Sequence, residues 1–180
     1  MTTQIDSLRD SIARENDEML SQPIATTVRV ADHADVDRLV AMAQTFYAAK
    51  YRDRMPEDPA HLRHVAAQLL ETGRVLVAEQ AGQIVGLLAA ALITHIIFNQ
   101  RIAVEVLWWV EPAARGSGVG TSLVRDMETW ATAQGAVKMQ FAAYRDRGVE
   151  DLYGRLGYTP HEVIFEKELD DAIPSIRTGG

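Results

Sequence analysis

The stretch from Val106 to Thr121 reads VLWWVEPAARGSGVGT, and it decides the fold. It begins with an apolar run rich in valine and tryptophan, which is typical of a buried strand. A proline and three glycines at alternate positions follow, and the apolar spacing beyond them predicts a helix. A strand that runs through a glycine-rich turn into a helix is therefore expected at this point of the chain.

The glycine-rich turn favours an anionic ligand. Gly116, Gly118 and Gly120 have no Cβ atom, so backbone N–H groups can approach a ligand closely. The N–H groups of a helix's first turn have no partner within the helix, and the helix dipole favours negative charge there. Such a turn binds phosphate or pyrophosphate, and Arg115 adds a cation at its edge.

Two common nucleotide motifs do not fit this turn. A dinucleotide fingerprint G-x-G-x-x-G that starts at Gly116 needs a glycine where the chain has Thr121, and one that starts at Gly118 meets Leu123. The Walker pattern needs Gly-Lys-Ser or Gly-Lys-Thr, which the turn lacks. The turn therefore predicts a phosphate ligand of another kind.

Outward from the turn, the hydrophobic periodicity predicts an α/β domain with a mixed sheet. Strands are expected at Thr26–Ala31, Arg74–Glu79, Gln83–Ile93, Ala103–Val110, Val137–Ala143 and Glu162–Leu169. Helices are expected from a cap at Asp32 to Lys50, and at Ala60–Thr72, Ser117–Gln134 and Gly148–Leu156, with an extra N-terminal helix at Ile5–Leu20. We expect an extension at 1–25, one domain at 26–169 and a flexible tail at 170–180.

Two motifs carry a family resemblance. Arg115, Gly118 and Gly120 match the spacing Arg-x-x-Gly-x-Gly, which resembles the acetyl-CoA pyrophosphate loop of the GNAT superfamily of N-acetyltransferases. Downstream, the run LYGRLGY at 152–158 resembles the superfamily's Leu-Tyr-x-x-x-Gly-Phe/Tyr signature. The resemblance spans about 26–169 and implies a GNAT-like mixed sheet flanked by helices. The run WWVEP at 108–112 is also similar to GNAT-like proteins encoded by phages.

The resemblance implies that acetyl-CoA is the co-substrate. In the family, the strand before the loop bulges and diverges from its neighbour, and its backbone pairs with the pantetheine arm. One tryptophan of the pair on this strand should face the core and the other the acceptor cleft, because neighbours on a strand alternate. The cofactor-binding positions carried over are Trp108, Trp109, Val110, Arg115, Gly116, Ser117, Gly118, Val119, Gly120 and Thr121. Many members have an asparagine seven residues before the signature tyrosine, where this chain has Asp146, whose charge is unfavourable near an anionic cofactor.

Tyr153 resembles the tyrosine that protonates the leaving thiolate in the family. A phenol with a pKa near 10 suits a thiolate with a pKa of about 8.5, because proton transfer between them is close to balanced. The alternative is a core tyrosine with a satisfied hydroxyl group.

A base is needed because an amine with a pKa of about 10 is only about 0.1% neutral at pH 7, a deficit of about 4 kcal/mol. Glu105, on the strand that leads to the expected bulge, is the favoured base, acting directly or through water. Glu111, just before the turn, is the alternative. Glu105 could also be an ordinary exposed strand residue.

The acceptor is left open by the residues. We expect direct transfer to the amine of a small molecule, such as a polyamine, an amino acid or an amine-bearing drug. The alternatives are a protein N-terminus or lysine, and a non-catalytic acyl-CoA-binding module. The Tyr153 signature argues against the last of these.

Composition narrows the function further. The chain has 180 residues, a formal net charge of -7 and no cysteine. It lacks the basic footprint of a nucleic-acid binder and cannot use thiolate ligands or a cysteine nucleophile. His61 and His64 lie three apart on a helix without a third ligand, so no metal is expected.

Compartment and assembly complete the expectations. The first residues lack a cationic region followed by an apolar run, and the stretch Ile84–Phe98 is too short to span a bilayer, so we expect a cytosolic protein without a membrane partner. The N-terminal helix has one narrow apolar stripe, formed by Ile5, Leu8, Ile12 and Met19. That stripe docks either on its own domain or on a second subunit of a homodimer.

Overall fold

The structure is a computed structural model that describes residues 25–50, 58–143, 147–165 and 167. The chain divides into two compact units, residues 1–144 and 145–180. The expected N-terminal helix at Ile5–Leu20 lies outside the described residues, so that helix and the homodimer stay predictions. Among the described residues, no helix has both the length and the apolar character needed to cross a bilayer.

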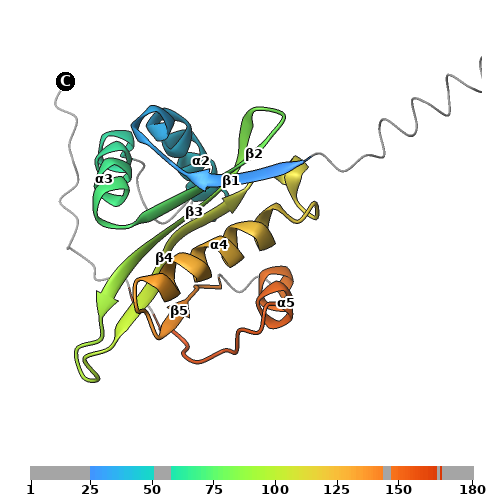
Figure 1. The fold of residues 1–180 in the computed structure, drawn as a ribbon. Coiled ribbons are helices and arrows are strands. Elements are labelled where there is room, and N and C mark those ends of the chain that lie inside the picture. Colours follow the sequence, from blue (N-terminus) through green and yellow to red (C-terminus); the bar gives the residue numbers. More distant parts are fainter. Residues whose placement is uncertain (1–24, 51–57, 144–146, 166, 168–180) are drawn as a thin grey trace, which may run out of the picture. The chain divides into compact units, whose positions relative to one another are not determined.

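The first unit contains one five-stranded sheet with the order β1-β2-β3-β4-β5 (Figure 1). Its strands are β1 (Thr26–Val30), β2 (Arg74–Gln80), β3 (Gln83–Thr94), β4 (Arg101–Val110) and β5 (Lys138–Gln140). The first four strands pair antiparallel, and β5 pairs parallel with β4. The mixed sheet expected from the sequence is confirmed.

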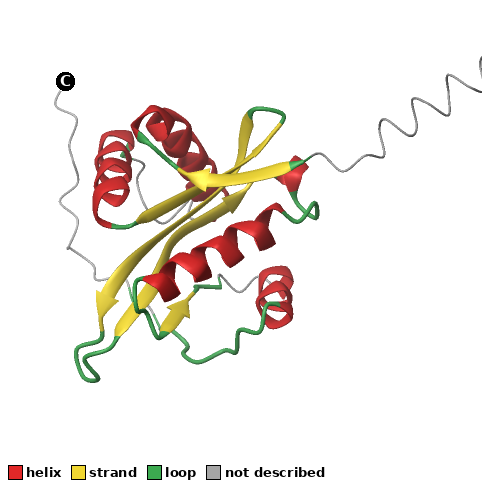
Figure 2. Ribbon diagram, viewed as in Figure 1, coloured by secondary structure: helices red, strands yellow, loops and turns green. Residues whose placement is uncertain are grey.

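Helices cover both faces of this sheet (Figures 1 and 2). Helices α2 (Val36–Lys50) and α3 (Pro59–Thr72) lie on one face, and α4 (Val119–Ala133) lies on the other. Two short 3-10 helices, η1 (His33–Asp35) and η2 (Pro112–Ala114), precede α2 and the glycine-rich turn. Strand alternation explains the two layers, because Val77 and Leu87 join the core beneath α2 while Gly86, the next residue back along β3, faces α4.

Gly86 lets α4 pack closely on the sheet. A Cβ atom at this position would lie 2.8 Å from Cγ1 of Val119 and 3.1 Å from Cδ1 of Leu123. Both of those residues are fully buried on α4. The absence of a side chain at Gly86 therefore fixes how close the start of α4 comes to β3.

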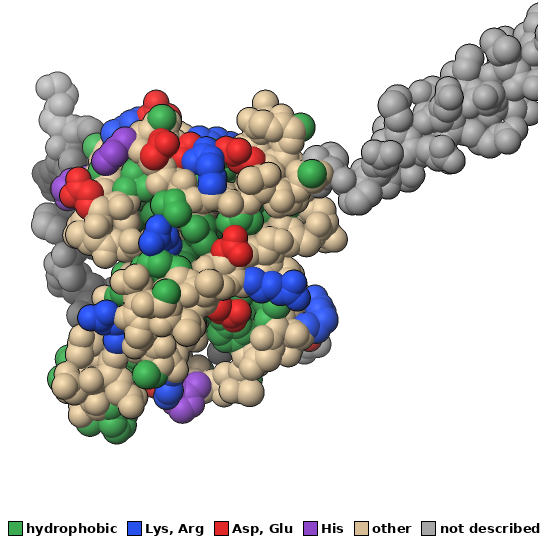
Figure 3. All heavy atoms as spheres, in the orientation of Figure 1, with side chains coloured by type: hydrophobic (Ala, Val, Ile, Leu, Met, Phe, Trp, Pro, Cys, Tyr) green, Lys and Arg blue, Asp and Glu red, His purple; other side chains and the backbone are tan. Residues whose placement is uncertain are grey.

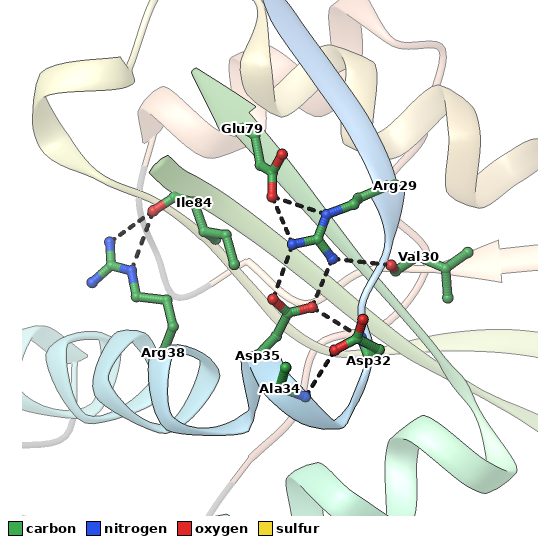
Figure 4. Close-up of polar contacts among 8 residues, drawn as sticks. All are labelled: Arg29, Val30, Asp32, Ala34, Asp35, Arg38, Glu79 and Ile84. Carbon is green, nitrogen blue, oxygen red and sulfur yellow. Dashed lines mark hydrogen bonds and ion pairs between the residues drawn. The ribbon is translucent and has the colours of Figure 1, made fainter. Parts of the chain in front are cut away.

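An ion-pair cluster ties β1 to β2 and to the start of α2 (Figure 4). Arg29 donates to both oxygens of Asp35 at 2.7 and 2.9 Å and to Oε1 of Glu79 at 2.6 Å. Asp35 also accepts from the backbone N–H of Asp32, whose own carboxylate accepts from the N–H of Ala34. The hydrogen bonds from Arg29 hold the pKa of Asp35 below its ordinary value. On the face drawn in Figure 3, side chains of both charges are interspersed.

Several element boundaries differ from those expected. Helix α4 begins at Val119 rather than Ser117, because Gly118 is its N-cap in a left-handed conformation. Strand β5 is limited to Lys138–Gln140, within the expected 137–143, and β4 begins two residues earlier than expected. The expected helix at Ala60–Thr72 begins at Pro59, after Asp58 as its N-cap.

The second unit contains α5 (Arg147–Arg155), which confirms the helix expected at Gly148–Leu156. The strand expected at Glu162–Leu169 is wrong for the described residues, since 162–165 and 167 form no strand. The apolar run Val163–Phe165 has side chains that are 73 to 91% exposed. β-propensity reflects packing on a sheet, and the described residues of this unit contain no other strand with which the run could pair.

Candidate active site

The glycine-rich turn has the backbone geometry of an anion-binding loop. Gly116 and Gly118 have φ angles of 81° and 90°, a region that residues with a Cβ atom rarely adopt. The first helical hydrogen bond runs from the N–H of Ser122 to the carbonyl of Gly118 at 3.0 Å. The N–H groups of residues 119–121 precede this bond, so they have no partner within the helix. No atom lies within 4 Å of a Cβ built on either glycine, which leaves room for a ligand.

Gly120 has a different role from the other two glycines. Its φ angle is not positive, but a Cβ atom here would lie 3.0 Å from Cζ2 of Trp108. The ring of Trp108 also packs on Phe141, with 5.7 Å between ring centroids. Gly120 therefore brings the first turn of α4 against the Trp108 indole.

The two tryptophans face opposite sides of the sheet, as strand alternation requires. Trp109 is 7% exposed and belongs to the core beneath α2, with its ring 6.1 Å from that of Phe46. Trp108 is half-buried on the α4 side. The expectation that one of the pair lies in the core is confirmed for Trp109.

Arg115 is held at the edge of the turn. Its Nε donates to the carbonyl of Val110 at 3.0 Å, and its guanidinium carbon lies 4.7 Å from the centroid of the Trp109 ring. A guanidinium over an indole face is attracted by the ring quadrupole. The stack keeps the positive charge beside the loop that follows.

Strand β4 has the bulge and the divergence that the family resemblance implies. Ala89 pairs with Leu107 and Ala90 with Glu105, so Val106 is an extra residue on β4. On its other side, β4 pairs with β5 only from Ile102 to Val104. The two parallel strands separate just where Glu105 follows.

Glu105 lies at this point of separation and reaches towards the chain that follows β5. Its Oε2 accepts from the backbone N–H of Ala142 at 3.0 Å. Burial raises the pKa of Glu105, and hydrogen bonds from the backbone N–H groups of Ala142 and Trp108 oppose that rise. Among the described residues no lysine, arginine or histidine forms an ion pair with Glu105.

Glu111, the alternative base, is engaged on both oxygens. Its Oε1 accepts from Arg38 at 2.7 Å, and its Oε2 accepts from Nε1 of Trp109 at 3.4 Å. Arg38 also donates to the carbonyl of Ile84 at 2.9 Å. Glu111 therefore joins α2 to the end of β4, and this contact holds the two elements together.

Ser117 forms a contact that the sequence did not indicate. Its hydroxyl donates to the carbonyl of Ala114 at 2.7 Å and accepts from Nε2 of Gln80 at 3.3 Å. The hydroxyl proton is thus already used within the protein. Nothing in the sequence around Gln80, the last residue of a strand, marked it for this contact.

Tyr153 lies on α5 in the second unit and is 9% exposed. Its ring centroid is 5.9 Å from that of Tyr158, and its carbonyl accepts from the Tyr158 N–H at 2.9 Å. The signature residues are thus packed around a tight helix end closed by Gly157, whose φ angle is 89°. Asp146 lies outside the described residues.

The histidines do not form a cluster. Within the described ranges, no group of three His, Asp or Glu side chains is arranged to hold a metal ion. His61 and His64 are exposed on α3. His95 accepts through Nδ1 from the N–H groups of Ile97 and Phe98, both at 3.3 Å, and so organises the turn between β3 and β4.

Comparison with known proteins identifies the family. The model of the acetyltransferase (GNAT) family matches residues 36–158, which include both the turn and the Tyr153 signature. No curated protein sequence matches the chain. Its fold is nevertheless shared by many solved structures.

Three of these structures illustrate the range of the fold. A predicted acetyltransferase with acetyl-CoA from Clostridium acetobutylicum is 19% identical, with a TM-score of 0.69 over 80% of this chain and 96% of that one. An aminoglycoside acetyltransferase from an uncultured soil sample, in complex with sisomicin, is 18% identical, with a TM-score of 0.61 over 80% and 96% of the two chains. A transcriptional regulator from Bacillus halodurans is 20% identical, with a TM-score of 0.68 over 81% and 100%. At these identities the likeness concerns the fold.

Proposed function

The chain belongs to the GNAT acetyltransferase family, and on that premise we propose that it transfers the acetyl group of acetyl-CoA directly to the amine of a small molecule. The observation that carries this proposal is that a candidate base and a candidate pyrophosphate loop lie close together in the sequence, joined by the last residues of β4. Glu105 stands where β4 and β5 separate, and the open turn at Gly116–Gly118 follows at the end of β4.

The residues of the turn suit the pyrophosphate of CoA. The N–H groups of Val119, Gly120 and Thr121 start a helix whose dipole favours an anion, and Gly118 puts no side chain in front of them. Arg115, stacked on Trp109, supplies a nearby positive charge. In the family the pantetheine arm lies along the strand that precedes the turn, and the separation of β4 from β5 beyond Val104 gives it a place.

Glu105 is the base that we propose. A carboxylate whose pKa is raised by burial binds a proton more strongly than an exposed one, and this brings it closer to the pKa of the amine that it must deprotonate. Glu111 is a poorer candidate, because loss of its charge on protonation would break the contact with Arg38. The neutral amine then attacks the thioester carbonyl carbon, the new C–N bond forms, and the C–S bond breaks. The nitrogen releases its excess proton to water, so that a neutral amide remains, and a proton from water later restores the acid that protonates the sulfur.

Tyr153 is the acid that we propose. The departing sulfur carries the electron pair of the broken C–S bond as a thiolate, and it takes the phenolic proton. This assignment rests on the match of residues 152–158 to the family signature.

A small-molecule amine is the acceptor class that we favour. Support comes from the structurally similar soil protein, an aminoglycoside acetyltransferase in complex with sisomicin. The net charge of -7 adds a weak attraction for such cations. Peptide and protein amines are the competing acceptors, and a non-catalytic acyl-CoA-binding module is the competing role.

The test is a thiol-release assay with acetyl-CoA and a panel of aminoglycosides, polyamines, amino acids and short peptides. We expect free CoA to appear with at least one small amine, in equal amount to the acetylated product measured by mass spectrometry. Turnover with peptides alone would move the acceptor to the protein class. Tight binding of acetyl-CoA in calorimetry without turnover of any amine would favour the non-catalytic module.

A further inference from the structure

Gln80 makes a chain of hydrogen bonds that ends in the glycine-rich turn. It is the last residue of β2 and is 9% exposed, which makes it one of two buried polar side chains among the described residues. Its Nε2 donates to Oγ1 of Thr26 at 3.0 Å and to Oγ of Ser117 at 3.3 Å. Ser117 in turn donates to the carbonyl of Ala114 at 2.7 Å.

The direction of each bond is fixed by the groups involved. The side-chain nitrogen of Gln80 carries two protons and is a donor in both contacts. The Ser117 hydroxyl has one proton, which goes to the Ala114 carbonyl, so it must accept from Gln80. The hydrogen bonds therefore run from the amide of Gln80, at the end of β2, to the hydroxyl of Ser117 within the turn, and from there to the carbonyl of Ala114 before it.

The turn needs such an anchor. Ser117 lies between Gly116 and Gly118, both of which have positive φ angles and no neighbour near a Cβ position. Glycines lose the most conformational freedom on ordering, and a loop fixed in advance binds more tightly than one that must be ordered by its ligand. Ser117 supplies the one side chain between the two glycines that can hold the loop.

We propose that Gln80 is a positioning residue for the CoA pyrophosphate, acting through Ser117 to hold the backbone N–H groups of the turn in their binding geometry. This inference rests on the proposed use of acetyl-CoA. It also assigns Ser117 a role in which the hydroxyl group binds the protein and the backbone binds the ligand.

The variant Gln80→Leu tests the proposal, because it keeps the bulk of the side chain and removes the amide. We expect its Kd for CoA, measured by calorimetry, to rise about three- to tenfold, the range of one lost hydrogen bond. We also expect KM for acetyl-CoA to rise in parallel while kcat stays within about twofold, because the contact favours ground and transition states equally.

Thr26→Val is the matched control. It removes the other partner of the same Gln80 nitrogen and leaves the bond to Ser117 in place. Both variants are expected to lower the unfolding temperature, so a purely structural role of Gln80 would weaken CoA binding equally in the two. We expect the Kd for CoA to change in Gln80→Leu and to stay within about twofold of the wild type in Thr26→Val.

A double-mutant cycle with Ser117→Ala completes the test. If Gln80 acts through Ser117, the effect of Gln80→Leu on the Kd for CoA should largely disappear in the Ser117→Ala background. Independent, multiplying effects, or an unchanged Kd in Gln80→Leu, would overturn the positioning role and leave the proposed function intact. A wild-type protein that does not bind CoA would overturn the proposed function and this inference with it.

Discussion

Asp35 and Glu105 are two carboxylates of the same unit in opposite environments. Asp35 accepts two hydrogen bonds from Arg29, and its pKa lies below the ordinary value (Figure 4). Glu105 has backbone N–H donors but no ion-pair partner among the described residues, and burial raises its pKa. A carboxylate that is satisfied in its charged form stabilises the fold, whereas one that is desolvated is ready to take a proton.

The two carboxylates have different roles in this molecule: Asp35 contributes to the stability of the fold, and Glu105 is the proposed base. The Arg29 cluster joins β1, β2 and η1, and none of its groups lies in the turn or at the point where β4 and β5 separate. Glu105 costs the fold some stability, because a desolvated charge is unfavourable, and that cost is characteristic of functional groups. Substitution of Asp35 should therefore lower the free energy of unfolding and leave kcat/KM nearly unchanged, whereas substitution of Glu105 should lower kcat/KM.

The largest expected effect is on catalysis at Glu105. Glu105→Gln keeps an oxygen that can accept from the Ala142 N–H but removes the base, so we expect kcat/KM to fall about 10³-fold, within the range of general-base contributions. The Kd for CoA should stay within about threefold. The measurement is thiol release with the best amine of the panel.

Glu111→Gln is the control for this variant. It changes the other candidate base and weakens the contact with Arg38, so it should lower the unfolding temperature while keeping kcat/KM within about fivefold. If Glu111→Gln is the slower enzyme, the base is Glu111, and the comparison between Asp35 and Glu105 no longer separates stability from chemistry.

Tyr153 should give the next largest effect. Tyr153→Phe removes one hydroxyl group and should lower kcat by about 10²-fold, with little change in CoA affinity. Tyr158→Phe is a matched control, since its ring packs against Tyr153 in the same short helix end. Turnover within about twofold of the wild type in Tyr153→Phe would make this tyrosine structural and leave thiolate protonation to water or another group.

Asp35→Asn should show the reverse pattern. We expect a loss of about 1–2 kcal/mol in the free energy of unfolding at pH 7, because one charged partner of Arg29 is lost while Glu79 remains. The loss is small because the Arg29 side chain is 36% exposed, and solvent screens its ion pairs. Chemical denaturation measures this loss, and kcat/KM should stay within about threefold. If Asp35→Asn lowered kcat/KM more than Glu105→Gln does, the assignment of the Arg29 cluster to stability would be contradicted.

Some of these features could be predicted from the sequence, because they depend on residues that are close together in the chain. The turn at Gly116–Gly120 and the helix after it follow from residues that are neighbours in the chain, and the structure confirms them within two residues. The Asp32 cap was predictable for the same reason. The family signature placed Tyr153 among the candidates, and the position of Glu105 on the strand before the turn placed that residue among them. Neither indicated the environments in which the two side chains lie.

The remaining features depend on residues far apart in the sequence. Gly86 matters because α4 comes within contact of β3, and Gln80 matters because Ser117, 37 positions later, comes within reach of its amide. No local pattern encodes either approach. The strand expected at Glu162–Leu169 is absent from residues 162–165 and 167, which the structure describes, for a related reason: an apolar run becomes a strand only when another strand pairs with it.

The smallest expected effect is the pH dependence of stability, and its sign distinguishes the two carboxylates. The folded-state pKa of Asp35 is lowered, so its stabilising contribution is present above its unfolded pKa of about 3.8 and is lost as pH falls through the folded value. The deficit of Asp35→Asn against the wild type should therefore shrink as pH falls below about 4.

Glu105 should behave in the opposite way. Its folded-state pKa is raised, so its contribution is present below the unfolded value of about 4.5 and is lost as pH rises through the folded value. Glu105→Gln removes this titration, and its free energy of unfolding relative to the wild type should increase from pH 4 to pH 8. Urea unfolding of the wild type and both variants at four pH values measures the two slopes. Slopes of the same sign would mean that the backbone N–H donors of Glu105 outweigh its desolvation, and the case for Glu105 as a desolvated base would fall.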